Sequence, residues 1–156
     1  MSRPDVGDPF PNATLAAPDG RTIELDSQAG KKRVIFFYPK DDTPGCTTEN
    51  KDFSALSQDF AQAGVELLGV SKDPPAKHAR FAAKHSLTAP LASDAETDGL
   101  AEKLGIWVEK ALYGRKYMWM ERTTYLVDSR GKIARVWRKV KVAGHAAEVL
   151  EAARAL

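Results

Sequence analysis

Apolar residues gather in dense runs joined by segments with helical spacing. Residues 33–38 (RVIFFY) are β-branched and aromatic, which predicts a strand buried on both faces, and Pro39 ends it. Residues 65–70 (VELLGV) predict the next strand. Between these runs apolar residues recur at helical spacing from 53 to 63, so we expect a helix that Gly64 ends.

The second half of the chain continues this alternation. Asp73 has the chemistry of a helix N-cap, with Pro74 at the first helical position, and the helix is expected to end near His85. Two apolar runs around the turn sequence DSRG predict a pair of strands. These strands and a final helix are expected at residues 123–127, 133–137 and 144–156.

Three segments lie outside this alternation. Residues 14–16 and 22–25 flank a Pro-Asp-Gly turn, which predicts a small N-terminal hairpin. Ser93 and Glu96 have capping-box spacing and predict a short helix. Residues 106–121 are rich in aromatic residues and lysine without a clear period, so they are interpreted as a loop with functional potential.

The order of elements indicates the fold class. Without the hairpin and the segment before residue 122, the chain has the order β-α-β-α-β-β-α, which favours a central mixed sheet with helices on both faces. This is the element order of the thioredoxin fold. We expect an α/β protein with a thioredoxin fold, an N-terminal hairpin and an insertion before the last two core strands, as a single domain over residues 1–156.

Composition narrows the class of protein. The 156 residues are 43% apolar and 28% charged, which is typical of one globular domain. A net charge of +2 gives no reason to expect a nucleic-acid or membrane-surface partner. No apolar run is long enough to span a membrane, and the N-terminal segment has no signal-peptide core. A single cysteine excludes an intrachain disulfide, so a reducing, cytoplasmic setting is expected.

The single cysteine, Cys46, lies where a buried strand gives way to a helix. Thr43 suits the helix N-cap and Pro44 the first helical position, which places Cys46 in the first turn. The free N–H groups and the helix dipole there favour an anion such as a thiolate. Gly45 lets a small molecule approach the backbone. The alternative is a buried cysteine without chemistry, the common fate of a lone cysteine.

The sequence around Cys46 is similar to that of a known enzyme family. Residues 39–49, PKDDTPGCTTE, strongly resemble the peroxidatic-cysteine motif of the peroxiredoxins, Pro-x-x-x-Thr-x-x-Cys. The longer string VIFFYPKDDTPGCTTE resembles the Q-type subfamily, also called bacterioferritin comigratory proteins. So do VELLGVSKD, ERTTYLVDSRGKI and RVWRKVKVAGH, and the resemblance spans residues 7–152.

The resemblance implies a thiol peroxidase and assigns roles to single residues. Cys46 is expected to be the nucleophile, and Thr43 to hydrogen-bond the thiolate and the peroxide oxygen. Pro39 is expected to shield the site, and Arg122 to be the active-site arginine. Arginine suits this role because its planar, protonated fork can stabilise charge on the departing oxygen. Together with Gly45, the residues Thr43, Cys46 and Arg122 are expected to bind the peroxide.

Simpler roles remain open for some of these residues. Arg122 is alternatively a solvated strand-end residue, and Thr43 a plain N-cap. Glu49 is expected either to orient Arg122 or the local backbone, or to be a solvated residue of the helix start. The two roles of Thr43 are compatible, because a hydroxyl both donates and accepts hydrogen bonds.

The chain departs from the subfamily at the residue that resolves the oxidised cysteine. Many Q-type members have a second cysteine five residues after the first, where this chain has Lys51. The sulfenic acid formed at Cys46 must therefore be reduced by an external thiol. The expected partners are a hydroperoxide and a thioredoxin, glutaredoxin or low-molecular-weight thiol. No cofactor is implied, and the resemblance favours a monomer.

Other features predict no separate activity. His78, His85 and His145 lack metal-ligand spacing, so no metal is expected. The basic stretch 135–141 is interpreted as the solvated side of a strand rather than a nucleic-acid site. The aromatic and apolar residues before Arg122 form either an apolar wall near the site or a loop packed on the core; these are Tyr113, Tyr117, Trp119 and Met120.

We therefore expect a one-cysteine, thiol-dependent peroxidase that reduces hydrogen peroxide and small organic hydroperoxides. Two other classes of function remain open. One is a redox-responsive binding protein whose cysteine oxidises without significant turnover, and the other is a thioredoxin-fold adaptor with an inert thiol. The position of Arg122 relative to the Cys46 sulfur discriminates a reactive cysteine from an inert one.

Overall fold

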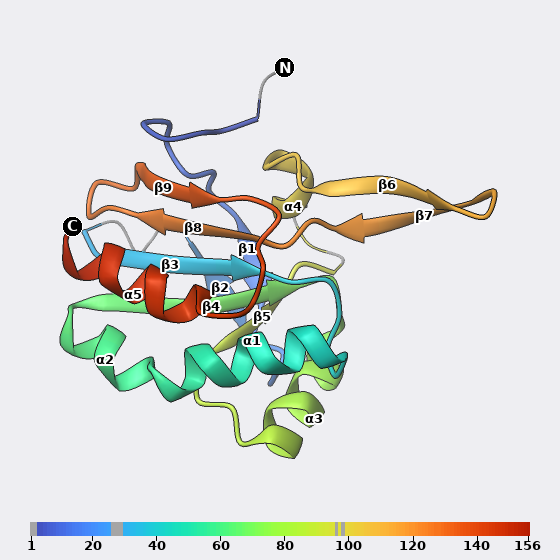
Figure 1. The fold of residues 1–156 in the computed structure, drawn as a ribbon, viewed down its shortest axis with the longest axis horizontal. Helices are drawn as coiled ribbons and strands as arrows, with labels where there is room; N and C mark the ends of the chain where they lie inside the picture. The colour runs from blue at the N-terminus through green and yellow to red at the C-terminus, as the bar shows by residue number, and fades with distance from the viewer. Residues whose placement is uncertain (1–2, 26–29, 96, 98) are drawn as a thin grey trace.

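The computed structural model describes residues 3–25, 30–95, 97 and 99–156, and Figure 1 shows its fold. The first half of the chain contains β1 (Thr14–Ala16), β2 (Thr22–Glu24), β3 (Lys32–Phe37), α1 (Pro44–Ala55), α2 (Ser57–Gln62), β4 (Val65–Ser71) and α3 (Pro75–His85). The second half contains β5 (Leu91–Ser93), α4 (Leu100–Lys103), β6 (Trp107–Leu112), β7 (Arg115–Met120), β8 (Thr123–Val127), β9 (Ile133–Trp137) and α5 (His145–Arg154).

Most of the described strands form one mixed sheet in the order β2-β1-β5-β4-β3-β8-β9. β3, β4 and β5 run parallel, whereas β8 and β9 run antiparallel to their neighbours. The last residue of β3, Phe37, lies opposite Thr123, the first residue of β8. This register places residue 122 beside the end of β3, where the connection to α1 begins.

Two apolar clusters cover the two faces of the sheet. One contains Phe53 of α1, Phe60 of α2 and Val149 of α5. The other contains Leu100 of α4 together with Phe10 of the N-terminal lead-in. Figure 1 accordingly shows α4 on the opposite side of the sheet from α1 and α2. The mixed sheet with helices on both faces was predicted from the element order and is confirmed.

The predicted core elements appear with small shifts at their ends. The strands at 123–127 and 133–137 have the predicted bounds, and the N-terminal hairpin forms as β1 and β2. The helix expected before Gly64 is interrupted at Leu56, which ends α1 and precedes α2. The N-cap of α3 is Pro74, so the capping role predicted for Asp73 is wrong.

Residues 106–121 are not a loop, contrary to the prediction. They form the β6–β7 hairpin, a separate two-stranded sheet that projects from the body of the protein (Figure 1). Its turn contains Tyr113 at φ 50° and Gly114 at φ 77°, and two consecutive positive φ angles are typical of a type I′ hairpin turn. Most side chains of both strands are exposed, so the inward–outward alternation that predicts a strand is missing.

The capping box predicted at Ser93 is also wrong. Ser93 ends β5, a strand of only three residues that the sequence pattern did not reveal. Asp94 takes the capping role instead, because its carboxylate accepts hydrogen bonds from the N–H groups of Leu100 at 3.0 Å and Ala101 at 2.8 Å. Glu96, the other residue of the predicted box, lies outside the described residues.

Two wider expectations concern the chain as a whole. In the described part of the chain, every helix falls short of the length and apolar character that crossing a membrane requires. The prediction of one domain over residues 1–156 is not tested by the fold alone and stays a prediction.

Candidate active site

Cys46 lies in the first turn of α1, as predicted. Thr43 is at the N-cap with extended backbone angles, and Pro44 begins the helix. The Cys46 residue is only 1% exposed and packs in the apolar cluster beneath α1. Its carbonyl accepts a hydrogen bond of 2.9 Å from the side-chain amide of Asn50, which is also buried. The sulfur therefore belongs to a buried and closely packed turn of α1.

Arg122 reaches the sulfur from the other end of the sequence. It immediately precedes β8, and the pairing of β8 with β3 brings it to the start of the loop before α1. Its Nη2 atom is 3.4 Å from the Sγ atom of Cys46. Its Nη1 atom donates a hydrogen bond of 2.5 Å to Oε1 of Glu49. One guanidinium thus bridges the sulfur and a carboxylate one helical turn away.

The charges of this site are strongly coupled. Burial raises the pKa of Glu49 to about 7, even though the positive charge of Arg122 opposes the shift. Burial acts to lower the pKa of Arg122, but the carboxylate of Glu49 and the sulfur of Cys46 outweigh it and raise this pKa. The second carboxylate oxygen of Glu49 is buried and has no hydrogen-bond partner among the described residues. Glu49 is therefore not a solvated residue of the helix start, which was one of its two predicted roles. Its contact with Arg122 matches the other predicted role, in which it orients the arginine.

Gly45 leaves room for the guanidinium. A Cβ atom at this position would lie 3.3 Å from Nη2 of Arg122, which is tighter than ordinary van der Waals contact. The small residue predicted to permit a close approach is therefore close to Arg122. Binding of peroxide at Gly45 stays a prediction.

The other predicted site residues lie in the loop between β3 and α1. Thr43 takes the N-cap position, but its hydroxyl donates to the carbonyl of Lys40 at 2.9 Å instead of capping α1. Pro39 follows the end of β3 and is half-buried. The hydrogen bond from Thr43 to the thiolate and the shielding by Pro39 stay predictions.

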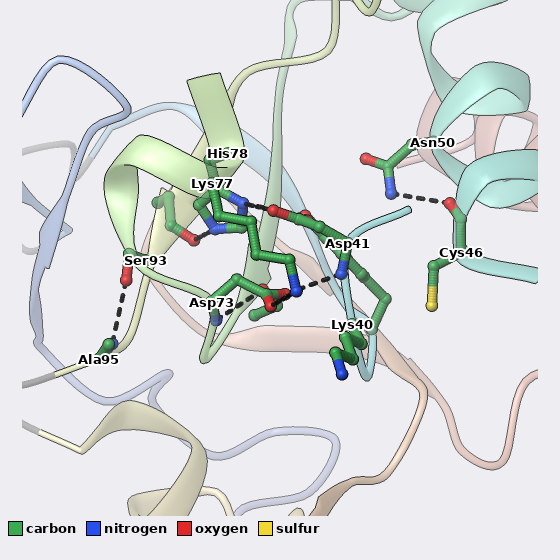
Figure 2. A network of polar contacts seen from close by, with 12 residues as sticks. Lys40, Asp41, Cys46, Asn50, Asp73, Lys77, His78, Ser93 and Ala95 are labelled. Carbon is green, nitrogen blue, oxygen red and sulfur yellow. Dashed lines mark hydrogen bonds and ion pairs between the residues drawn. The ribbon is translucent and has the colours of Figure 1, made fainter. Parts of the chain in front are cut away.

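A buried polar network holds this loop, and the sequence analysis missed it. Asp41 is 2% exposed and accepts a hydrogen bond of 2.6 Å from the hydroxyl of Tyr38. Its other oxygen is 2.6 Å from Nδ1 of His78, a fully buried residue of α3. The opposite nitrogen of this ring is 3.0 Å from the carbonyl of Ala92 in β5. Figure 2 shows Asp41 facing His78, with Cys46 and Asn50 on the neighbouring helix.

A second carboxylate holds the backbone of the same loop. The N–H group of Asp41 donates to Asp73 at 2.8 Å, and Ser71 and Lys77 donate to the same carboxylate at 2.7 and 2.8 Å. These contacts join the loop to the end of β4 and the start of α3 (Figure 2). The sequence carries no local signal for the contacts of Asp41 with Asp73 and His78, because Asp41 stands in a polar loop and these two partners are more than thirty residues away.

The aromatic wall predicted before Arg122 forms only in part. Tyr113 is 97% exposed at the hairpin tip and Met120 is buried in the core. Trp119 is the one of the four predicted residues that lines an open groove, and Arg122 lines the same groove. The groove has a volume of about 540 Å³, and its remaining lining residues are Val108, Glu109, Lys110, Glu121, Lys139 and Val140.

Sequence comparison identifies the family. Residues 6–136 match the model of the AhpC/TSA family. Peroxiredoxin Bcp of Bacillus subtilis is 42% identical over 147 residues, which cover 94% of this chain and 93% of the relative. Peroxiredoxin Bcp of Xanthomonas campestris is 44% identical over 150 residues, which again cover 94% of this chain and 93% of the relative.

Solved structures agree with this result. The bacterioferritin comigratory protein of Xanthomonas campestris, described for its alkyl peroxide reduction activity, superposes with a TM-score of 0.85 at 44% identity, covering 91% of this chain and 90% of that chain. PrxQ of Xylella fastidiosa superposes with a TM-score of 0.89 at 34% identity, covering 99% of this chain and 98% of that chain. The predicted thioredoxin fold is thereby confirmed. The chain belongs to the AhpC/TSA family and is a peroxiredoxin of the Bcp, or Q-type, group.

Proposed function

We propose that this chain reduces hydrogen peroxide and small organic hydroperoxides by nucleophilic attack of the Cys46 thiolate. The supporting observation is the 3.4 Å contact between Nη2 of Arg122 and the sulfur. A guanidinium at this distance favours the anionic sulfur and keeps a donor beside the atom that reacts. An inert thiol in an apolar interior would have no such partner.

In the oxidising step the sulfur attacks the terminal oxygen of the hydroperoxide. The S–O bond forms while the O–O bond breaks, and the departing alkoxide takes a proton from solvent and leaves as an alcohol, or as water when the substrate is hydrogen peroxide. Cys46 becomes a sulfenic acid. Negative charge grows on the departing oxygen, and the guanidinium of Arg122 stabilises it in the transition state.

The neighbouring residues support this step in distinct ways. Glu49 is a positioning residue, because its carboxylate holds the guanidinium through the 2.5 Å bond to Nη1. The Thr43 hydroxyl, which donates to the Lys40 carbonyl at 2.9 Å, turns from that carbonyl to the thiolate and the peroxide oxygen when the peroxide binds, and Gly45 leaves the peroxide close to the backbone and Arg122. Pro39 limits the access of water to the loop before α1.

An external thiol completes the cycle, because the chain has no second cysteine. The thiol attacks the sulfenic sulfur, water leaves, and a mixed disulfide forms on Cys46. A second thiol attacks the sulfur of the bound reductant, which releases the Cys46 thiol and the oxidised reductant. Low-molecular-weight thiols, thioredoxins and glutaredoxins all have the chemistry for both steps. We place this cycle in the cytoplasm, where such thiols stay reduced. We also place it in a monomer of the chain.

A substitution at Cys46 tests the proposal. Consumption of hydrogen peroxide in the presence of excess dithiothreitol is expected for the parent chain and not for Cys46→Ser. Mass spectrometry after one equivalent of peroxide should show the gain of one oxygen atom on Cys46. Peroxide consumption by Cys46→Ser at the parent rate would refute the nucleophile, and one oxidation without repeated turnover would indicate a redox-responsive binding protein.

A further inference from the structure

The groove beside Arg122 has the size and charge of a small-molecule site. Its volume of about 540 Å³ falls in the range of ligand pockets in proteins. Arg122 connects it to the active site, since this residue lines the groove and also contacts the Cys46 sulfur at 3.4 Å. The N–H group of Val140 donates to the carbonyl of Arg122 at 3.0 Å, which holds the neighbouring Lys139 along the same edge.

The cations of the groove outnumber the acids available to neutralise them. Lys110 and Lys139 are exposed and, within the described ranges, form no ion pair with a carboxylate. Glu121 has a cationic partner already, Arg3 at 3.7 Å. The Arg122 guanidinium is paired with Glu49. Two lysine ammonium groups therefore stay free to bind an anion.

The pleat of the hairpin places Lys110 and Glu109 on opposite faces. Lys110 pairs with Tyr117 and Val108 pairs with Trp119, and both pairs share one face because successive side chains of a strand alternate. The Nζ atom of Lys110 also lies 5.6 Å from the centroid of the Trp119 ring, within the distance of about 6 Å at which cation–π attraction acts. Glu109, between Val108 and Lys110, belongs to the opposite face of the pleat, although it is one of the residues that line the groove. The groove face of the hairpin is thus cationic and aromatic.

We propose that this groove binds the reducing thiol, and that its ligand is a low-molecular-weight thiol with free carboxylates, such as a cysteine-containing tripeptide. The proposal rests on the proposed function, which requires an external thiol at Cys46. Carboxylates of the thiol pair with Lys110 and Lys139, and the peptide backbone packs against Trp119. This arrangement holds the thiol next to Arg122 until the oxidised sulfur becomes accessible.

The chemistry of the bound thiol follows the cycle already given. Its sulfur attacks the sulfenic sulfur of Cys46, the S–O bond breaks, and the hydroxyl leaves as water with the proton of the thiol. A second molecule of the same thiol attacks the sulfur of the bound thiol, which breaks the mixed disulfide and releases the Cys46 thiol and the disulfide of the reductant. The reductant is oxidised by two electrons and no other oxidant or cofactor is needed.

Steady-state kinetics with a matched pair of thiols tests the groove. The probes are glutathione and its dialkyl ester, which keeps the thiol and lacks the free carboxylates. The parent chain is expected to have a KM for glutathione several times lower than for the ester. Lys110→Gln and Lys139→Gln should each raise the KM for glutathione about three- to fivefold, the effect of one partly exposed ion pair, with little change in kcat. Higher ionic strength should raise the same KM.

Lys116→Gln is the matched control, because Lys116 pairs with Ala111 on the opposite face of the hairpin. Its KM for glutathione should equal that of the parent chain. Equal KM values for glutathione and the ester, or an equal effect of all three lysine substitutions, would overturn the proposal. So would turnover supported only by a protein reductant.

An alkyl hydroperoxide that carries a carboxylate tests whether the groove binds the peroxide substrate instead of the thiol. If the two groove variants slowed oxidation by this hydroperoxide and left the KM for glutathione unchanged, the groove would hold the peroxide and the proposal would be wrong. Failure of the proposed function itself has a different signature. In that case stopped-flow mixing with peroxide, before any thiol is added, would form no sulfenic acid at Cys46.

Discussion

At Arg122, a single guanidinium makes two contacts that a lysine could not make together. Its two terminal nitrogens reach the Cys46 sulfur at 3.4 Å and the Glu49 carboxylate at 2.5 Å. An ammonium is a point charge on a flexible stem and lacks this fork. Arg122→Lys is therefore expected to lower the second-order rate constant for oxidation by hydrogen peroxide about 100-fold, the usual cost of one lost transition-state donor.

Stopped-flow tryptophan fluorescence measures this rate constant. Arg135→Lys is a suitable control, because Arg135 is exposed and lies over the Trp137 ring at 4.6 Å, in a different part of the sheet. The control should oxidise at the parent rate. If Arg122→Lys also kept the parent rate, charge alone would suffice and the bridging geometry would have no role.

At Glu49, burial makes the stability of the protein depend on pH. The folded-state pKa of about 7 lies above the ordinary value of 4.5, so the folded state holds the proton more tightly than the unfolded state. The stabilisation is complete below about pH 4.5 and is lost as pH rises through 7. The size of this loss is about 3 kcal/mol, from 1.36 kcal/mol for each unit of pKa.

Glu49→Gln removes this dependence, because an amide does not titrate. The free energy of unfolding, measured with urea at pH 5 and pH 8, should fall more for the parent chain than for the variant. Between pH 5 and pH 8 the parent chain is expected to lose about 2–3 kcal/mol more of its free energy of unfolding than the variant, because part of the total is already lost at pH 5. Parallel pH profiles would show that Glu49 is ionised throughout this range.

The loop between β3 and α1 depends on a buried anchor. Asp41 accepts a hydrogen bond from the Tyr38 hydroxyl and contacts Nδ1 of His78, both at 2.6 Å, and an asparagine would replace one carboxylate oxygen by an NH2 group and remove the charge. Asp41→Asn is expected to lower the free energy of unfolding by about 2–3 kcal/mol, since hydrogen bonds to a charged group are stronger than those to a neutral amide. The rate constant with peroxide should fall as well, because the same loop contains Pro39 and Thr43.

The next residue provides the control for this prediction. Asp42 is 41% exposed and pairs at the surface with Lys84 and His85. Asp42→Asn keeps a side chain that tolerates the positive φ of this position, so it should cost less than about 1 kcal/mol. Equal losses in urea unfolding for the two variants would contradict the role of Asp41 as an anchor.

The elements that could be predicted are those with a buried face. The strand predicted at 33–38 is apolar from Val34 onwards because both of its faces are covered, and the resulting run is visible in the sequence. The β6–β7 hairpin was missed because its side chains are mostly exposed and its turn has Tyr-Gly in place of the more usual Asn-Gly. β5 was missed because three residues are too few for a period.

The site shows the same division between local and distant signals. Cys46 and Glu49 are neighbours on one helical turn, so a sequence motif contains both. Arg122 could be placed only through the family resemblance, since its contact with Cys46 spans 76 residues. The contact of Asp41 with His78 belongs to no motif and arises only from the packing of α3 against the loop.

For the molecule as a whole, reduction of the oxidised sulfur requires a change of shape. Cys46 is 1% exposed and lies in a packed cluster, so a thiol larger than a peroxide reaches it only when the first turn of α1 moves. An added thiol within the same helix meets the same obstacle. Residues five apart in an α-helix have Cα atoms about 8.6 Å apart, from the helical rise and radius. A disulfide needs a separation below about 7 Å.

Lys51→Cys tests whether the first turn of α1 must open, because Lys51 is five residues after Cys46 and is exposed on α1. After one equivalent of peroxide, the introduced thiol is expected to attack the sulfenic acid, release water and form an intrachain disulfide. Since the intact helix holds the two residues too far apart, the far-UV circular dichroism should lose helical signal as the disulfide forms. Lys51→Ser, which adds no thiol, should keep its helix after oxidation. A disulfide formed with full helical signal would show that the first turn of α1 need not open.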